Sequence, residues 1–327
     1  MENILTVSNS PHIVGKDTVR SIMLDVIIAL LPALIAGCII FGLRALVVTA
    51  VCVLSCVIAE YIWNKLLKKD NTCGDLSAVV TGMLLAYNMP ASIPLWMTVI
   101  GSVFAIIVVK QFFGGLGHNF MNPALAARAF LLASWALAMT TWYPVGTIFP
   151  VFSAPDAVSS ATPLAAYGAG DTAKYSYLTL FLGNYGGCIG ETSALALLLG
   201  AAYLVVKRVI RIRVPLIYIA TVAVGTWLFA GSNGIGSGDW LYQILSGGLI
   251  LGACFMATDY TTTPTTPKGQ IIFALGCGII TVLIRVWGGY PEGVSYSILL
   301  MNIATPLIDK FTAPKRFGYV KSKKEAA

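Results

Sequence analysis

Charged residues are scarce in this sequence. Asp, Glu, Lys and Arg make up 11% of its 327 residues, against about 25% in an ordinary soluble domain. Hydrophobic residues make up 57%, and the mean hydropathy is +0.82. The charges also lie between apolar runs long enough to cross about 30 Å of hydrocarbon. The sequence therefore predicts an all-α integral membrane protein.

The motifs of soluble enzymes are missing as well. The sequence has no Walker loop, no G-x-G-x-x-G and no H-E-x-x-H, and its two histidines leave little for acid–base chemistry. None of the seven cysteines forms a C-x-x-C. Cys52 and Cys56 share a helix face, which favours helix packing over a metal site because no His lies near them. We expect no catalytic residue, no metal ligand and no ATP-driven transport.

The net charge of +7 has the distribution of a membrane protein and not of a nucleic-acid-binding protein. With the N-terminus placed inside, 17 of the 21 Lys and Arg residues fall in cytoplasmic segments. The outer segments hold Arg44, Lys174 and Arg285. This asymmetry predicts cytoplasmic termini and an extracytoplasmic loop at 140–190. The first 21 residues lack an apolar core, so no cleavable signal peptide is expected.

Apolar runs predict about ten transmembrane helices. Their ranges are Ile22–Gly42, Leu43–Trp63, Ser77–Met89, Pro94–Phe113, Phe120–Met139, Glu191–Val206, Val214–Ala230, Trp240–Ala257, Gln270–Trp287 and Gly293–Leu307. A shorter apolar patch at Tyr177–Leu182 fits the membrane interface. The predicted units are an N-terminal repeat, the loop, a C-terminal repeat and a basic tail, at 1–139, 140–190, 191–309 and 310–327.

The two halves of the sequence share a pattern. Gly82–Pro94 and Gly252–Pro264 both begin with Gly and end with Pro at the same spacing. Each ends a helix early and precedes a long helix that runs into Gly-Gly. Because each half has five spans, the halves must enter the membrane from opposite sides, as inverted repeats do. Such interrupted helices either line a binding or permeation site or simply end at the surface.

One segment of the 140–190 loop carries a chemical signal, and it reads DAVSSATP from Asp156 to Pro163. Further motifs accompany it along the chain: Ser10–Ile13 (SPHI), Ile22–Val26 (IMLDV), Gly114–Pro123 (GGLGHNFMNP), Gly190–Ser193 (GETS), Phe255–Asp259 (FMATD) and Pro291–Gly293 (PEG). Together they resemble the family of the B subunit of sodium-pumping NADH:quinone oxidoreductase and the D subunit of the Rnf ion-translocating electron transport complex. The short N-terminus is more similar to the Rnf member.

The resemblance implies a covalent flavin. In that family a flavin transferase reads D-x-x-[ST]-G-A-T and joins FMN to the final Thr through a phosphoester. Thr162 is the matching acceptor, and the recognition residues are Asp156, Ser159, Ser160 and Ala161. Ser160 departs from the pattern because it replaces the usual Gly. The family also implies a second, non-covalent riboflavin.

The resemblance further implies a place in an electron-transfer complex of the bacterial inner membrane. Electrons pass from ferredoxin through flavins to NAD while Na⁺ or H⁺ moves outward, and the partners are the A, B, C, E and G subunits. This chain would be one link and not the NAD or ferredoxin site. A passive small-solute channel is the alternative, because a five-helix inverted repeat also resembles the urea-channel architecture. A flavin signal that survives denaturation separates the two functions.

Polar residues within the helices are costly in lipid and form a further group of candidates. Arg128 lies near the middle of its predicted helix, where it suits either a flavin phosphate or ring carbonyl or a salt bridge to another helix. Asn119 and Asn122 suit either helix caps or flavin contacts.

Three acids lie at or near predicted helix ends. Asp25, Glu191 and Asp259 suit either an ion pathway or capping and interfacial positions. Glu191 falls in the first turn of its predicted helix, where the helix dipole favours a carboxylate. Asp259 follows an interrupted helix, and we expect it to be the strongest of the three for ion transport.

Overall fold

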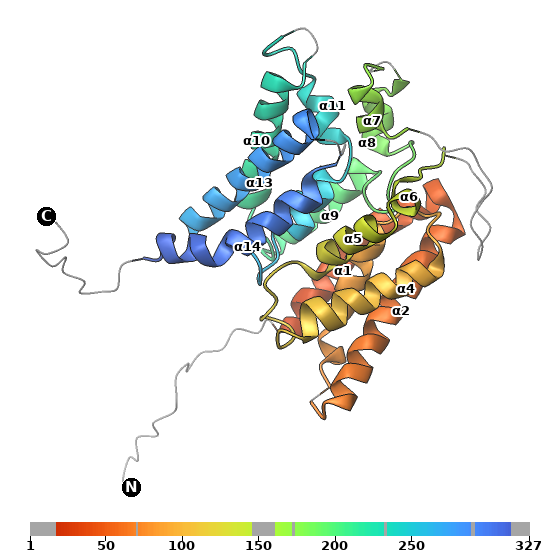
Figure 1. Ribbon diagram of the computed structural model, residues 1–327, viewed down its shortest axis with the longest axis vertical. Coiled ribbons are helices and arrows are strands. Elements are labelled where there is room, and N and C mark those ends of the chain that lie inside the picture. Colours follow the sequence, from red (N-terminus) through yellow and green to blue (C-terminus); the bar gives the residue numbers. More distant parts are fainter. Residues whose placement is uncertain are drawn as a thin grey trace, which may run out of the picture.

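A computed structural model describes residues 18–69, 71–145, 161–171, 174–231, 234–288 and 292–314. Across these ranges the regular elements are helices, joined by one isolated bridge between Pro90 and Cys188 (Figure 1). Three helices are long and apolar enough to cross a membrane: α1 (Val19–Phe41), α2 (Leu43–Leu66) and α13 (Pro267–Trp287). The all-α membrane class predicted from composition is confirmed.

The first half of the chain follows the predicted segments closely. After α1 and α2 come a 3-10 turn η1 (Cys73–Asp75), the short helix α3 (Ser77–Tyr87), α4 (Leu95–Val103), the π-helix η2 (Phe104–Gln111), α5 (Pro123–Ser134) and α6 (Ala136–Thr140). Thr18 caps α1, and Asn122 caps α5 by accepting hydrogen bonds from the N–H groups of Ala124 and Leu125. Side-chain caps satisfy N–H groups that the helix leaves free.

The second half begins after two short helices of the connecting segment, α7 (Pro163–Gly168) and α8 (Tyr177–Leu182). Its helices are α9 (Ala194–Val206), α10 (Arg213–Phe229), α11 (Trp240–Leu245), α12 (Leu249–Leu251), the π-helix η4 (Gly252–Met256), α13 and α14 (Val294–Thr312). The apolar patch predicted for the interface forms α8 with the predicted bounds. The proline-initiated helix α7 was not predicted.

Several predicted boundaries were wrong. The helix predicted at Phe120–Met139 begins at Pro123 and is interrupted at Trp135, which separates α5 from α6. The helix predicted at Trp240–Ala257 is broken after Leu245, because Gly247 adopts a left-handed conformation with φ 67°. The helix predicted from Glu191 begins at Ala194, where the Ser193 side chain supplies the cap. The tail predicted from residue 310 starts later, since α14 continues to Thr312.

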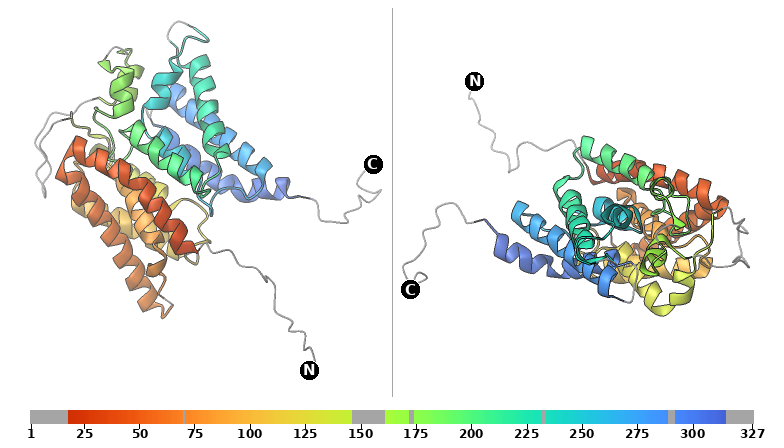
Figure 2. Two further views of the ribbon diagram at one scale, coloured as in Figure 1. Left: turned by 180° about the vertical axis from the view of Figure 1, so that it is seen from behind. Right: turned by 90° about the horizontal axis from the view of Figure 1, so that it is seen from above.

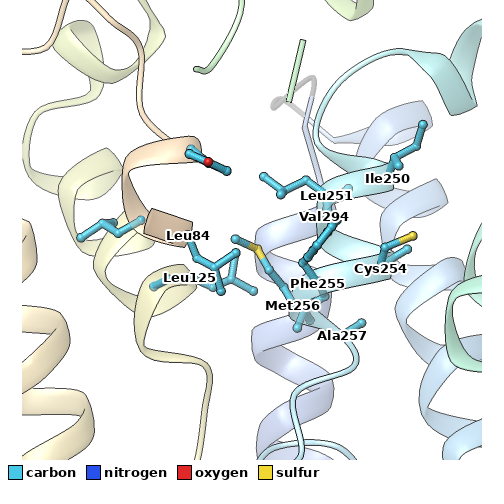
Figure 3. Packing of buried hydrophobic residues seen from close by; sticks show 14 of the residues in the cluster. Leu84, Leu125, Ile250, Leu251, Cys254, Phe255, Met256, Ala257 and Val294 are labelled. Atoms are coloured by element: carbon cyan, nitrogen blue, oxygen red, sulfur yellow. The ribbon is translucent and has the colours of Figure 1, made fainter. Parts of the chain in front are cut away.

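The two halves lie side by side, and α1 packs along α9 to join them (Figures 1 and 2). Near the junction the interrupted helix of each half ends. Figure 3 shows Leu84 of α3 and Leu125 of α5 facing Phe255 and Met256 of η4. All four side chains are buried in one hydrophobic cluster. The breaks in α3 and η4 therefore meet in the centre of the molecule and not at its surface.

Three cations that we counted in loops belong to helices, and Arg44 and Lys110 are buried while Arg285 is half-buried. Arg44 donates to the carbonyl of Ile93 at 2.8 Å, just beyond the end of α3. Lys110 belongs to η2 and is 1% exposed. Arg285 belongs to α13 and donates to the Gln243 carbonyl at 2.6 Å. Arg44 and Arg285 donate to carbonyls at helix breaks, and Lys110 pairs with the buried carboxylate of Glu60. The positions of these cations in the sequence did not reveal these partners. Removing them from the loop count leaves the charge asymmetry in place.

Candidate flavin and ion sites

A cavity of about 440 Å³ lies between α5, α6, α7 and α14. We call it the Thr162 cavity. Its walls include Thr162, Arg128, Glu292, Ser295, Trp142 and Tyr296. Its size falls in the range of small-molecule sites, roughly 300–1,000 Å³. The structure thus brings together two residues that are far apart in the sequence and that we singled out separately, Thr162 and Arg128.

Thr162 occupies the N-cap position of α7. Its backbone is extended, with φ −67° and ψ 160°, as expected for a residue before proline. Its Oγ1 accepts a hydrogen bond from the Ala165 N–H at 3.3 Å, and the residue is 6% exposed. The hydroxyl is therefore turned to the protein and not to solvent, because capping and cavity packing hold it there.

Arg128 makes the ion pair that we considered as one of its two roles. Its guanidinium pairs with Glu292 and donates to the Ser295 hydroxyl, and it reaches Asn88 Oδ1 at 3.4 Å. The residue is 8% exposed. An arginine has five donors in a planar fork, so three partners on different elements fix its orientation. This ion pair leaves Arg128 on the wall of the Thr162 cavity.

A second carboxylate stands behind this ion pair. Glu191 lies in the connection between α8 and α9, and its Oε1 accepts from the Cys188 N–H at 3.3 Å. Its Oε2 is buried and has no hydrogen-bond partner among the described residues. Burial, reinforced by the neighbouring Glu292, raises the pKa of the Glu191 carboxyl to about 8. Burial acts on Glu292 too, but Arg128 holds the pKa of that carboxyl below its usual value.

A smaller cavity of about 90 Å³ lies on the other side of the central core. We call it the Asp259 cavity. Asp259, Asn119, Asn122, Ser77 and Lys110 contribute to its walls. Asn119 is 7% exposed, and within the described part of the chain its buried Oδ1 has no hydrogen-bond partner. Asn119 and Asn122 are thus brought together with Asp259, whereas Thr162 and Arg128 share the other cavity.

Asp259 follows η4 and organises the turn after the helix break. Its Oδ1 accepts from the Thr261 N–H at 3.4 Å and its Oδ2 from the Thr262 hydroxyl at 3.3 Å. Both bonds are long, and no cation of the described residues pairs with this carboxylate within 4.0 Å. Asp259 therefore combines a role in the turn with a carboxylate on the wall of a mostly apolar cavity.

Comparison with known proteins identifies the family of this chain. The model of the NQR2, RnfD, RnfE family matches residues 6–318. The chain belongs to this family. It is 55% identical to the D subunit of the Na⁺-translocating ferredoxin:NAD⁺ oxidoreductase complex of Acetobacterium woodii, over 98% of each chain. It is 47% identical to the proton-translocating counterpart of Clostridium ljungdahlii, over 97% of each chain.

A more distant relative is the D subunit of the ion-translocating oxidoreductase complex of Stutzerimonas stutzeri, which is 38% identical over 93% of each chain. The match spans both cavities and the core between them. Relatives whose names give different transported ions are thus similar to this chain over at least 93% of its length.

Asp25 lines neither cavity, although Met23 and Val26 on the same helix line the Asp259 cavity. It accepts from the Tyr203 hydroxyl at 2.7 Å, and Lys207 approaches it at 3.8 Å. These contacts tie α1 to the end of α9. Asp156, Ser159 and Ser160 fall outside the described residues, and Ala161 is exposed, with its carbonyl accepting from Tyr175.

The sequence did not predict two ion pairs of this protein, Arg128–Glu292 and Lys110–Glu60. Glu292 lies in the PEG motif that we quoted, but nothing in the sequence linked it to Arg128. Glu60 and Lys110 form a second ion pair, at 2.8 Å between Nζ and Oε2, and both are almost fully buried. A Glu within an apolar run was the available signal for Glu60.

Proposed function

We propose that this chain is the flavin-bearing membrane subunit of an ion-translocating ferredoxin:NAD⁺ oxidoreductase complex, with FMN esterified to Thr162. The names of its relatives support the complex. The observation that carries the flavin assignment is the cavity shared by Thr162 and Arg128. A tether at Thr162 would keep the flavin beside a fixed cation.

The residues of the Thr162 cavity suit a flavin. Trp142 and Tyr296 offer aromatic surfaces, and Arg128 offers charged donors for a phosphate or a ring carbonyl. The ester oxygen at Thr162 can keep accepting from the Ala165 N–H, so modification does not require the loss of the cap. When bound, FMN supplies one- and two-electron transfer. The chain would hold and orient it.

We also propose that the chain forms ten spans in two inverted repeats, as in the urea-channel architecture. In the first half α2 packs on α3 and α4, and in the second half α10 packs on η4 and α13. Each half thus packs its second long helix against an interrupted helix and the long helix that follows. The buried apolar core between the two cavities argues against an open pore.

The Asp259 cavity is our proposed entry for the transported cation, Na⁺ or H⁺. It would open on the cytoplasmic side of the inner membrane, together with both termini. The buried Asn119 Oδ1 and the Asp259 carboxylate give it acceptor character. Asn119 and Asn122 on its wall are our proposed contacts for a non-covalent riboflavin, and the cavity of about 90 Å³ would have to widen to admit that ligand. Other subunits of the complex, together with a flavin transferase during maturation, complete the set of partners.

Mass spectrometry of the assembled complex tests the flavin assignment. The peptide that contains Thr162 should carry the mass of FMN less one water, and the band should fluoresce after denaturing electrophoresis. Thr162→Ala should abolish both signals and stop electron transfer. Thr179→Ala is the control: it removes a hydroxyl that is hydrogen-bonded to Ser176 at the start of α8, and it should retain the flavin and electron transfer. An unmodified Thr162 peptide from an active complex would refute the proposal.

A further inference from the structure

The buried ion pair of Glu60 and Lys110 belongs to a longer chain of hydrogen bonds. Lys110 Nζ contacts both Glu60 oxygens, at 2.8 and 3.1 Å, and donates to Ser77 Oγ at 2.6 Å. Ser77 Oγ in turn donates to Asp75 Oδ1 at 2.6 Å. Asp75 is half-buried, whereas Ser77 and Lys110 are buried and line the Asp259 cavity. The chain therefore connects a surface carboxylate with that cavity.

We infer that Asp75, Ser77 and Lys110 form a proton relay between the protein surface and the Asp259 cavity, with Glu60 as the positioning residue. The inference rests on the proposed cation-transport function. In the observed orientation Lys110 gives a proton to Ser77 Oγ while Ser77 gives its own to Asp75. The neutral amine then takes a proton from the cavity, and Asp75 releases one to solvent. Rotation of the serine hydroxyl allows the reverse direction, which outward transport requires: protonated Asp75 donates to Ser77 Oγ while Ser77 donates to the neutral amine of Lys110. Lys110 then delivers a proton to the cavity, and Asp75 takes another from solvent.

The geometry favours a proton over a metal cation. The links are direct hydrogen bonds, so a proton can pass without the chain opening to admit a hydrated ion. Among the described residues, Lys110 also has the thiol of Cys73 nearby, and Asp259 lies on the wall of the same cavity. The relay is therefore a route for protons and not for a hydrated metal ion.

Stability alone does not account for this cluster. Glu60 also accepts from the Thr72 hydroxyl at 2.6 Å and from Gln111 Nε2 at 3.1 Å. These bonds hold its carboxylate in one place beside Lys110. Desolvation of a buried ion pair often cancels its attraction, and an apolar replacement can be equally stable. Lys110 also lies in a π-helix, an irregularity that is frequent at functional sites.

Proton release by the complex in proteoliposomes tests the relay. Ferredoxin-driven turnover is followed with a pH-sensitive dye in Na⁺-free buffer, in H₂O and in D₂O. Ser77→Ala removes one link and leaves the Glu60–Lys110 pair in place. We expect it to slow proton movement by about a hundredfold or more, the scale of a lost proton-transfer group. Ser77→Thr, which keeps a hydroxyl, should restore most of the rate.

Two further variants separate a relay from a structural ion pair. Lys110→Arg keeps the charge but does not release its proton, so it should also slow proton movement. Asp75→Asn should also slow proton movement. Asp309→Asn is the matched control, because Asp309 accepts from the N–H and hydroxyl of Thr265 as Asp75 does from those of Ser77. This control should leave proton movement unchanged. Wild-type proton rates and isotope effects in Ser77→Ala and Lys110→Arg would overturn the relay.

The same assay distinguishes failure of the relay from failure of the proposed transport function. Asp259→Asn is measured beside the relay variants. If Asp259→Asn slows ion movement and Ser77→Ala does not, the relay is wrong and the cavity remains a transport site. If neither variant affects ion movement, the Asp259 cavity lies outside the route. Absence of any proton movement in the wild-type complex would also refute the relay.

Discussion

Arg128 of α5 pairs with Glu292, the residue that precedes α14 by two positions. The pair joins the two halves of the chain at the wall of the Thr162 cavity. Because Glu191 lies behind Glu292, the charge that Arg128 presents to the cavity depends on both carboxyls. The cavity is therefore a place where an anionic or redox-active ligand and a buried acid can influence each other.

Disruption of this ion pair should separate stability from ligand binding. Arg128→Met leaves Glu292 buried without its partner and should destabilise the fold by about 3–5 kcal/mol. The double variant Arg128→Met, Glu292→Leu should recover most of that loss. It should nevertheless hold flavin with an altered reduction potential, since the cation is gone. Thermal unfolding and a redox titration measure the two effects, and a double variant with the wild-type potential would exclude flavin contact by Arg128.

The raised pKa of Glu191 predicts a pH-dependent activity. Below about pH 8 the carboxyl is protonated and neutral, and above that value it becomes a second negative charge beside Glu292. Electron transfer should therefore change as the pH passes through about 8. Glu191→Gln, which stays neutral, should remove this change, whereas the surface variant Asp309→Asn should keep it. An unchanged pH profile in Glu191→Gln would assign the dependence to another group.

Asp259→Asn should impair ion-coupled turnover more than assembly. The asparagine Oδ1 can still accept from the Thr261 N–H, so the turn after η4 should persist. The cavity loses its carboxylate, and a cation loses its counter-charge. Flavin content by fluorescence should match the wild type while ion-dependent electron transfer slows. Normal pumping by this variant would leave Asp259 with a capping role alone.

The predicted topology can be tested with two exposed lysines. Lys174 lies in the segment before α8, and Lys310 lies near the end of α14. In intact cells a membrane-impermeant thiol reagent should label Lys174→Cys, while Lys310→Cys should react only after lysis. The wild-type chain measures the background from its own seven cysteines. Labelling in the opposite order would reverse the orientation.

Sequence patterns predicted the helices well because hydrophobic runs and caps are local. The segment predicted at Ser77–Met89 ends at Tyr87, and Asn122 caps its helix as its position before Pro123 suggested. The break after Leu245 falls at Ser246-Gly247-Gly248, where Gly247 is left-handed. It was missed because the runs on either side are apolar, and glycine within an apolar run is also compatible with a continuous helix.

The sequence by itself determined the membrane class, the family and the acceptor motif around Thr162, since these depend on composition and on short motifs. Tertiary structure decided which polar groups share a site. It brought Arg128 to Glu292 and Thr162, and it placed Lys110 against Glu60 and Ser77. Such pairs join helices separated by tens of residues, so no local pattern encodes them. Burial of a charge in a low-dielectric interior requires a partner, but only packing selects which one.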